Sequence, residues 1–194
     1  LWHNEKKYGL FSVETLKLME ALAWMSIEQG NFTEAEYLCG RIINIRLSKV
    51  PPSEENNARL GTAYFLLGDA YLYQKQYLTA EINYDKSLKL AKDPEHKGDV
   101  FNRKGIVSQE QKNNEQALGF YSEAVREYEL AKASNPEMAG PVNIRIRNAY
   151  LALSEIYKKM GDNGKYNEYQ SLANALQAVK EIQHNEQNID IQGE

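Results

Sequence analysis

The single cysteine, Cys39, is the first residue to consider as a catalytic nucleophile. A catalytic thiol needs a partner base, and no histidine stands near Cys39 in sequence or in helical register. Cys39 lies close to Leu38 and Ile42 on the apolar side of an expected helix. Free cysteine behaves as a small hydrophobic residue in such a position. We therefore interpret Cys39 as a buried structural residue.

The remaining reactive residue types are scattered. A lone cysteine excludes an internal disulfide, and the three histidines are too dispersed for a His-built metal site; they are His3, His96 and His184. His96 follows Asp93-Pro94-Glu95, where we expect a solvated loop. The acidic pair Glu54-Glu55 follows Pro52-Ser53, a pattern that favours a helix N-terminus rather than a catalytic pair.

Motifs for catalysis are missing as well. The sequence contains no glycine-rich phosphate loop, zinc-ligand spacing or nucleophile elbow. Its thirteen tyrosines mostly fall at helical packing positions, which indicates core rather than a stacking surface. We therefore expect a protein that is not an enzyme and has no cofactor and no metal.

Composition narrows the class of protein further. The 194 residues include 23 Lys and Arg against 27 Asp and Glu, a net charge of −4, and 42% are hydrophobic. That hydrophobic fraction is too high for a disordered chain. Without a block of Lys and Arg we expect no direct nucleic-acid binding, and without a long apolar run no membrane span in this segment. A single cysteine is compatible with the cytoplasm, which is the expected location.

Prolines divide the chain into four segments. They stand in three clusters, Pro51-Pro52, Pro94, and Pro136 with Pro141. Proline interrupts helices because it lacks an N–H and its ring clashes with the preceding turn. Each segment also has a weaker break near its middle, where Gly, Asn or Lys-Gln would reverse the chain: 29–31, 75–76, 112–114 and 161–164. Asn31 with Glu34, and Asn113 with Gln116, resemble capping boxes.

Apolar spacing predicts helices on both sides of each break. Leu60, Tyr64, Leu67 and Tyr71 follow one another at intervals of four, three and four, which places them on one helical face. No segment alternates with period two, so we expect no sheet. An alanine follows the break in three segments, and a small residue there lets paired helices approach closely; these are Ala35, Ala80 and Ala117, 45 and 37 residues apart.

The second segment resembles the tetratricopeptide repeat. Its signature residues are Tyr64, Leu67, Gly68, Tyr71, Tyr77, Ala80 and Tyr84. The third segment departs from the pattern at Lys104, and the fourth has Tyr166 where the small alanine is usual. The resemblance implies an all-α, right-handed α-solenoid of about four helix–turn–helix repeats. Their long period is similar to that of kinesin light chains and bacterial peptide-sensing regulators.

The resemblance also sets the expected boundaries. The repeats would occupy about residues 12–50, 53–93, 95–135 and 141–182. Residues 1–11 are apolar enough to be the remnant of a preceding helix. Residues 183–194 are polar, so we expect the last helix to end near Ile182 and a disordered tail to follow.

In this family the first helices of successive repeats line a concave groove. By register, the groove residues would be Glu20, Trp24, Phe65, Asp69, Tyr73, Asn102, Arg103, Asn148, Glu155 and Lys158. Trp24, Phe65 and Tyr73 stand off the packing stripe, and Asn102 and Asn148 could pair with the backbone amides of a ligand. Glu20 and Trp24 stand where the carboxylate clamp of chaperone-binding members needs Lys and Asn, so we expect a different ligand.

These observations predict a non-catalytic scaffold that binds a protein or an extended peptide. Two alternatives stay open. One is a peptide-sensing regulatory module of a larger signalling or transcription protein. The other is a structural element that self-associates as a homodimer through an end of the array, since a solenoid end exposes apolar surface unless it is capped.

Overall fold

The computed structural model describes Gly9 and residues 12–192, with side chains up to residue 177. Every regular element in this part of the chain is a helix, as the sequence predicts. Apart from Gly9, the expected N-terminal segment 1–11 lies outside the described residues. None of the helices searched is both long enough and apolar enough to span a bilayer.

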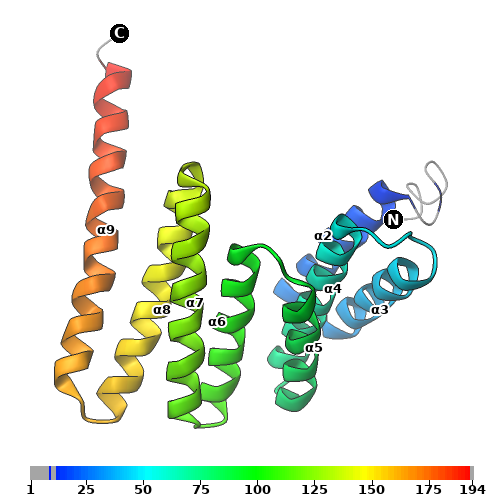
Figure 1. Ribbon diagram of the computed structural model, residues 1–194, viewed down its shortest axis with the longest axis horizontal. Helices are drawn as coiled ribbons and strands as arrows, with labels where there is room; N and C mark the ends of the chain where they lie inside the picture. The colour runs from blue at the N-terminus through cyan, green and yellow to red at the C-terminus, as the bar shows by residue number, and fades with distance from the viewer. Residues whose placement is uncertain (1–8, 10–11, 193–194) are drawn as a thin grey trace. The chain divides into compact units, whose positions relative to one another are not determined.

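The described helices form four antiparallel pairs, two in each of two compact units (Figure 1). Unit 1, residues 1–92, contains α2 (Val13–Glu28), α3 (Phe32–Ser48), α4 (Glu54–Tyr73) and α5 (Tyr77–Leu90). Unit 2, residues 93–194, contains α6 (Pro94–Glu110), α7 (Asn114–Ser134), the 3₁₀ turn η1 (Pro136–Met138), α8 (Ala139–Lys159) and α9 (Asn163–Gln192). The expected helix–turn–helix organisation is confirmed.

The four turns within pairs share one geometry. In each, the second residue after the helix end has a positive φ; these are Gly30 (75°), Lys75 (60°), Lys112 (62°) and Gly161 (80°). In the first turn the Gly30 amide donates to the Ile27 carbonyl (3.0 Å) and the Asn31 amide to that of Ser26 (2.7 Å). The other three turns repeat both bonds, which satisfy carbonyls at the helix end. Two of these turns therefore place a lysine in a conformation that suits glycine.

Side-chain caps start several helices. Ser12, Ser53, Asp93 and Asn113 each accept a hydrogen bond from a backbone N–H in the first turn. The expected cap at Asn113 is confirmed. The one at Asn31 is wrong, because its side chain makes no capping bond. His96 was expected in a loop; it lies instead half-buried in the first turn of α6.

A small residue on the first helix faces a partner sixteen residues later on the second. A Cβ added at Gly68 would lie 2.5 Å from the Tyr84 ring, and one at Gly105 would lie 2.8 Å from Tyr121. At the equivalent position of the fourth pair, the Gln170 amide donates to Ser154 Oγ (2.9 Å). In the first pair the equivalent residues are Ala23 and Cys39, both fully buried in one core cluster. Glycine is thus required where the partner is a tyrosine.

The register alanines Ala35, Ala80 and Ala117 are fully buried, as expected. In α9 Tyr166 is only half-buried, and the buried small residue is Ala173, two turns further on. The helix continues to Gln192, past the end expected near Ile182. The mobility expected of residues 183–194 stays a prediction, and Gly193 and Glu194 lie outside the described part.

Candidate functional site

The expected groove residues fall into two sets, one in each unit. Unit 1 holds Glu20, Trp24, Phe65, Asp69 and Tyr73; unit 2 holds Asn102, Arg103, Asn148, Glu155 and Lys158. We describe each set within its own unit.

Trp24 is the large aromatic residue of α2 that remains exposed. Its exposed fraction is 56%, whereas Ala23 beside it is fully buried. Trp24 follows Glu20 by four residues, which rotates it only about 40° around the helix. The indole therefore lies on the side of α2 on which Glu20 reaches α3 and α4.

Glu20 was expected to face a ligand, but it is occupied inside the protein. Its exposed fraction is 8%. Oε1 accepts a hydrogen bond from Arg46 Nη2 of α3 (2.8 Å), and Oε2 accepts one from Arg59 Nη1 of α4 (3.3 Å). Glu20 thus joins three helices, because a carboxylate on this face can accept from two guanidinium groups at once.

Arg46 is slightly more deeply buried than Glu20, with 6% of its surface exposed. Its Nη1 donates to Asn56 Oδ1 (3.3 Å), and Asn56 Nδ2 donates to the Arg46 carbonyl (3.2 Å). Nε of Arg46 is buried without a partner among the described residues. Two guanidinium groups share one carboxylate here, so the cluster has one surplus positive charge. Arg59, whose side chain is 40% exposed, carries that charge to the surface.

The other unit 1 candidates are engaged within the fold to different degrees. Asp69 is buried and accepts a 2.6 Å hydrogen bond from the Tyr84 hydroxyl. Phe65 is half-buried, with its ring 5.9 Å from that of Tyr84. Tyr73 is 50% exposed and stacks on Phe32 at 6.1 Å. Asp69 was expected in the groove; it is instead part of the contact between α4 and α5.

The unit 2 candidates are more open. Asn102 and Arg103 are half-buried on α6, while Asn148, Glu155 and Lys158 are exposed on α8. Lys158 Nζ lies over the Tyr166 ring at 5.4 Å. The exposed positions of Asn148, Glu155 and Lys158 leave their polar groups accessible to a ligand.

A charged network beside these residues joins α6, α7 and α8. Arg145 contacts Glu95 (2.7 Å) and Asp99 (3.1 Å), and the Tyr128 hydroxyl donates to Asp99 (2.8 Å). Burial, together with the Asp99 charge, raises the pKa of Tyr128. Here two carboxylates face Arg145, the reverse of the ratio around Glu20.

Arg59 and Arg145 occupy the same register position, nine residues before Gly68 and Ser154 respectively. Each joins the first helix of its pair to the first helix of the pair before it. We did not expect either bridge from the sequence. For the bridge at Glu20 the available signal was Arg46, a charge on the apolar stripe of α3, since buried charges need partners.

Burial shifts the pKa values of two reactive side chains outside these sets. Burial raises the pKa of the Cys39 thiol to about 12, so the thiol stays protonated at neutral pH. Burial also lowers the pKa of His96. The described residues contain no group of three or more His, Cys, Asp or Glu that could hold a metal ion.

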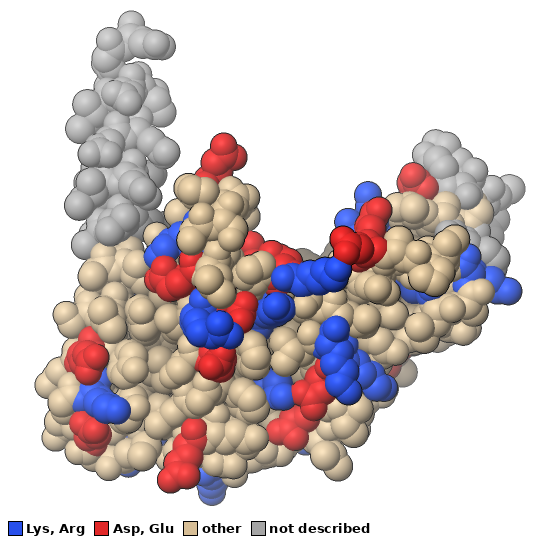
Figure 2. Space-filling view, in the orientation of Figure 1, with Lys and Arg blue, Asp and Glu red and all other residues tan. Residues whose placement is uncertain are grey.

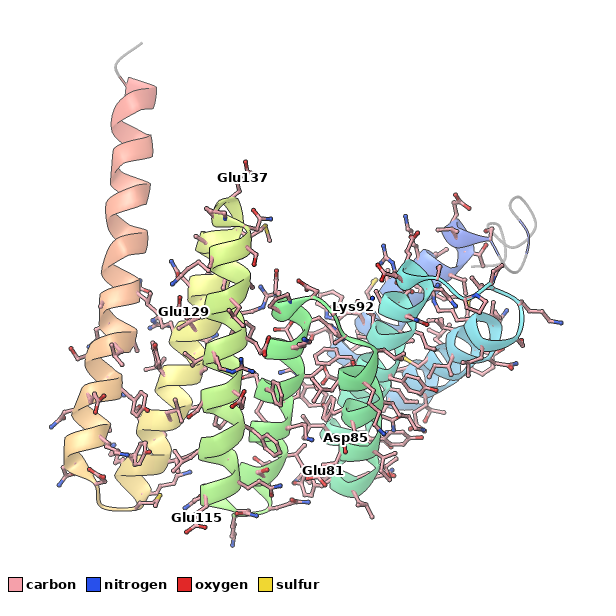
Figure 3. The ribbon with its side chains drawn as sticks, viewed as in Figure 1. Glu81, Asp85, Lys92, Glu115, Glu129 and Glu137 are labelled. Atoms are coloured by element: carbon pink, nitrogen blue, oxygen red, sulfur yellow. The ribbon has the colours of Figure 1, made fainter. Side chains whose placement is uncertain are left out.

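Charges on the visible surface are mixed. Figure 2 shows Lys and Arg interspersed with Asp and Glu on the face displayed. Figure 3 labels Glu81, Asp85 and Lys92 on or just after α5. Lys92 pairs with Glu54 at the start of α4, and both are largely exposed. Such exposed pairs contribute little to stability, so the buried Glu20 cluster is the more informative feature.

No family model and no curated protein matches this sequence. Solved structures do match. Aspartyl phosphate phosphatase F from Bacillus subtilis superposes with a TM-score of 0.74 at 20% identity, over 86% of this chain and 41% of that one. MamA matches with a TM-score of 0.60 at 16% identity, over 85% and 80%. BtubC (BKLC) from P. vanneervenii matches with a TM-score of 0.51 at 17% identity, over 87% and 82%.

The chain has the tetratricopeptide-repeat fold. At these identities the matches establish the fold and nothing further. This chain spans less than half the length of the phosphatase. Its four helix pairs agree with the four repeats expected from the sequence.

Proposed function

We propose that this protein is a non-catalytic binding module whose unit 1 holds an extended peptide segment of a partner protein. The segment would lie on the side of α2 and α4 that carries Trp24. The observation that supports this most directly is the 56% exposure of the indole, next to a fully buried Ala23. Exposed tryptophan is favourable for binding because it buries a large area while ordering few bonds.

The surroundings of Trp24 suit a peptide. Glu20 and Arg59 tie α2 to α4, so the ring projects from a fixed pair of helices. Thr62 of α4 is half-buried and lies one helical turn beyond Arg59, on the same side of the helix. A peptide there would contact an apolar ring, a hydroxyl and a guanidinium group. In unit 2 we propose that Asn102 and Asn148 pair with backbone amides of a bound segment, with Arg103, Glu155 and Lys158 beside them.

Selection from a displayed library of random twelve-residue peptides tests the proposal. We expect enriched peptides to bind the wild-type chain and to bind Trp24→Ala at least tenfold more weakly, a loss typical of an interface anchor. Tyr37→Ala is the matched control: Tyr37 also has an exposed fraction of 56%, but it lies on the second helix of the same pair.

The melting temperature of each variant must be measured with its affinity. A Trp24→Ala protein that stays folded and loses the peptides supports the proposal. Peptides that bind Trp24→Ala as well as wild type, or that depend on Tyr37 instead, would overturn it. So would unfolding of Trp24→Ala, because the ring would then belong to the core.

A further inference from the structure

We infer that the unit 1 surface recognises a carboxylate side chain flanked by apolar residues within the bound segment. Arg59 would bind the carboxylate, and Trp24 would pack against a neighbouring apolar side chain. This inference rests on the proposed function, because it names the chemistry of the peptide.

The first support is the charge of the Glu20 cluster. Glu20 is shared between Arg46 and Arg59, and the closer of the two contacts is to the buried Arg46 (2.8 Å against 3.3 Å). The described residues give Arg59 no other ionic partner. A guanidinium has five N–H donors in a planar fork that fits a carboxylate. Arg59 is therefore a partly exposed cation whose donors are mostly unused.

The second support is the buried Nε of Arg46, which has no hydrogen-bond partner within the part of the chain that the structure describes. Arg46 is more than nine-tenths buried, so water screens its charge poorly. Two guanidinium groups held around one carboxylate repel each other in this environment. A second carboxylate at Arg59 would balance the cluster, and a basic side chain would add to the repulsion. The surface thus selects for negative charge.

The third support is the spacing of the two contact groups. Trp24 lies one helical turn, about 6 Å, beyond Glu20 along α2, and Arg59 contacts Glu20. In an extended peptide, alternate side chains point the same way and are spaced by about 7 Å. A carboxylate and an apolar side chain two residues apart could therefore contact Arg59 and Trp24 together.

Unit 2 provides the contrast. Arg145 holds the same register position as Arg59 but faces two carboxylates, Glu95 and Asp99. Its charge is already balanced within the fold. A surplus positive charge is therefore a property of the Glu20 cluster and not of the repeat, and Arg145 serves as the matched control.

The experiment uses three pools of blocked seven-residue peptides of the form X-Leu-X-Z-X-Leu-X, where X is an equimolar mixture of uncharged amino acids without tryptophan. The central residue Z is Asp, Asn or Lys, and leucines on both sides make the pools independent of binding direction. The chain has two tryptophans, so a Trp2→Phe background makes Trp24 the sole indole reporter. Binding is followed by Trp24 fluorescence at 50 mM and 500 mM salt.

We expect the Asp pool to bind about tenfold more tightly than the Asn pool, as for a charge-assisted hydrogen bond, and the Lys pool to bind most weakly. The preference should shrink at high salt. Arg59→Gln should abolish it, Arg59→Lys should keep part of it, and Arg145→Gln should leave it unchanged. Thermal melts of all variants accompany the titrations.

The outcomes separate the two proposals. Equal binding of the Asp and Asn pools by wild type, or a preference for Lys, overturns the carboxylate inference and leaves peptide binding intact. That comparison needs no variant, so it holds even if Arg59→Gln fails to fold. An Asp preference that survives in folded Arg59→Gln also overturns the inference. Absence of binding by every pool overturns both proposals.

Discussion

One close contact, with the ring of Tyr84, explains why position 68 is a glycine. A Cβ there would lie 2.5 Å from Tyr84 Cε1, which is closer than Cβ atoms approach other atoms in proteins. Tyr84 is fully buried and its hydroxyl is tied to Asp69, so the ring has no room to move away. We expect Gly68→Ala to lower the free energy of unfolding by about 1–3 kcal/mol.

Gly40→Ala is the control for this change. Gly40 lies in α3 of the same unit, is exposed, and has no atom within 4 Å of an added Cβ. Alanine there should raise the free energy of unfolding by up to about 1 kcal/mol, through helix propensity alone. Both are measured by urea unfolding. Equal effects of the two substitutions would show that Gly68 is not held against Tyr84.

Cys39 makes the free energy of unfolding fall at alkaline pH. Burial raises its pKa from 9.0 to about 12, so above pH 9 the unfolded thiol loses its proton before the folded one does. The contribution of Cys39 to the free energy of unfolding is therefore fully present below pH 9. It is lost as the pH rises toward 12, at about 1.4 kcal/mol per pH unit. Urea unfolding of wild type and Cys39→Ala between pH 8 and 11 measures this difference.

The difference between the two proteins isolates the effect of the cysteine from that of every other ionisable group. A constant difference across the pH range would contradict the burial effect. Alkylation provides a second measurement. At pH 8.5 the native thiolate should be about a thousandfold scarcer than in a thiol of ordinary pKa, so iodoacetamide should react mainly after unfolding in urea.

At the scale of the helices, the turn within the second helix pair holds a lysine in a strained backbone conformation that glycine would relieve. Lys75 has a φ of 60°, a conformation that costs an L-residue about 1–2 kcal/mol. Glycine removes that cost but gains freedom in the unfolded chain. We expect Lys75→Gly to raise the free energy of unfolding by up to about 1 kcal/mol.

Lys17→Gly distinguishes relief of turn strain from a general effect of losing a lysine. Lys17 is exposed in the second turn of α2 in the same unit, so glycine there should lower the free energy of unfolding by about 1 kcal/mol. Urea midpoints of the two variants should move in opposite directions. A destabilised Lys75→Gly would mean that the side chain makes a contact that outweighs the backbone strain.

The helices were largely predictable from the sequence because their signals are local. Proline clusters, turn residues and apolar spacing each depend on a few neighbouring positions, and the buried Ala80 and Ala117 follow from that spacing. The ion pair between Glu20 and Arg46 was not predictable in this way. Its partners are 26 residues apart, and nothing in either local pattern identifies the other. Candidate ligand contacts chosen by register alone therefore included two carboxylates, Glu20 and Asp69, that the fold already uses.

At the scale of the whole molecule, the division into two units was also beyond the sequence pattern, since the helical periodicity is similar in all four segments. Each unit nevertheless has its own buried cluster. In unit 1 the cluster includes residues of α2, α3 and α4. In unit 2, buried residues of α7 and α8 pack with Ile106 of α6 and Tyr169 of α9. Repeat arrays are held together by such neighbour contacts rather than by one central core.

We therefore expect residues 93–194 to fold when expressed without residues 1–92. Tyr121 and Tyr128 would remain covered, because their contacts at Gly105 and Gly98 lie within the same unit. The fragment should show a helical circular dichroism spectrum and one cooperative urea transition. Gly105→Ala should destabilise the fragment and the full chain by the same amount, about 1–3 kcal/mol, since the added Cβ meets the same ring. A fragment that is unfolded, or that melts without cooperativity, would show that the unit 2 core requires residues of unit 1.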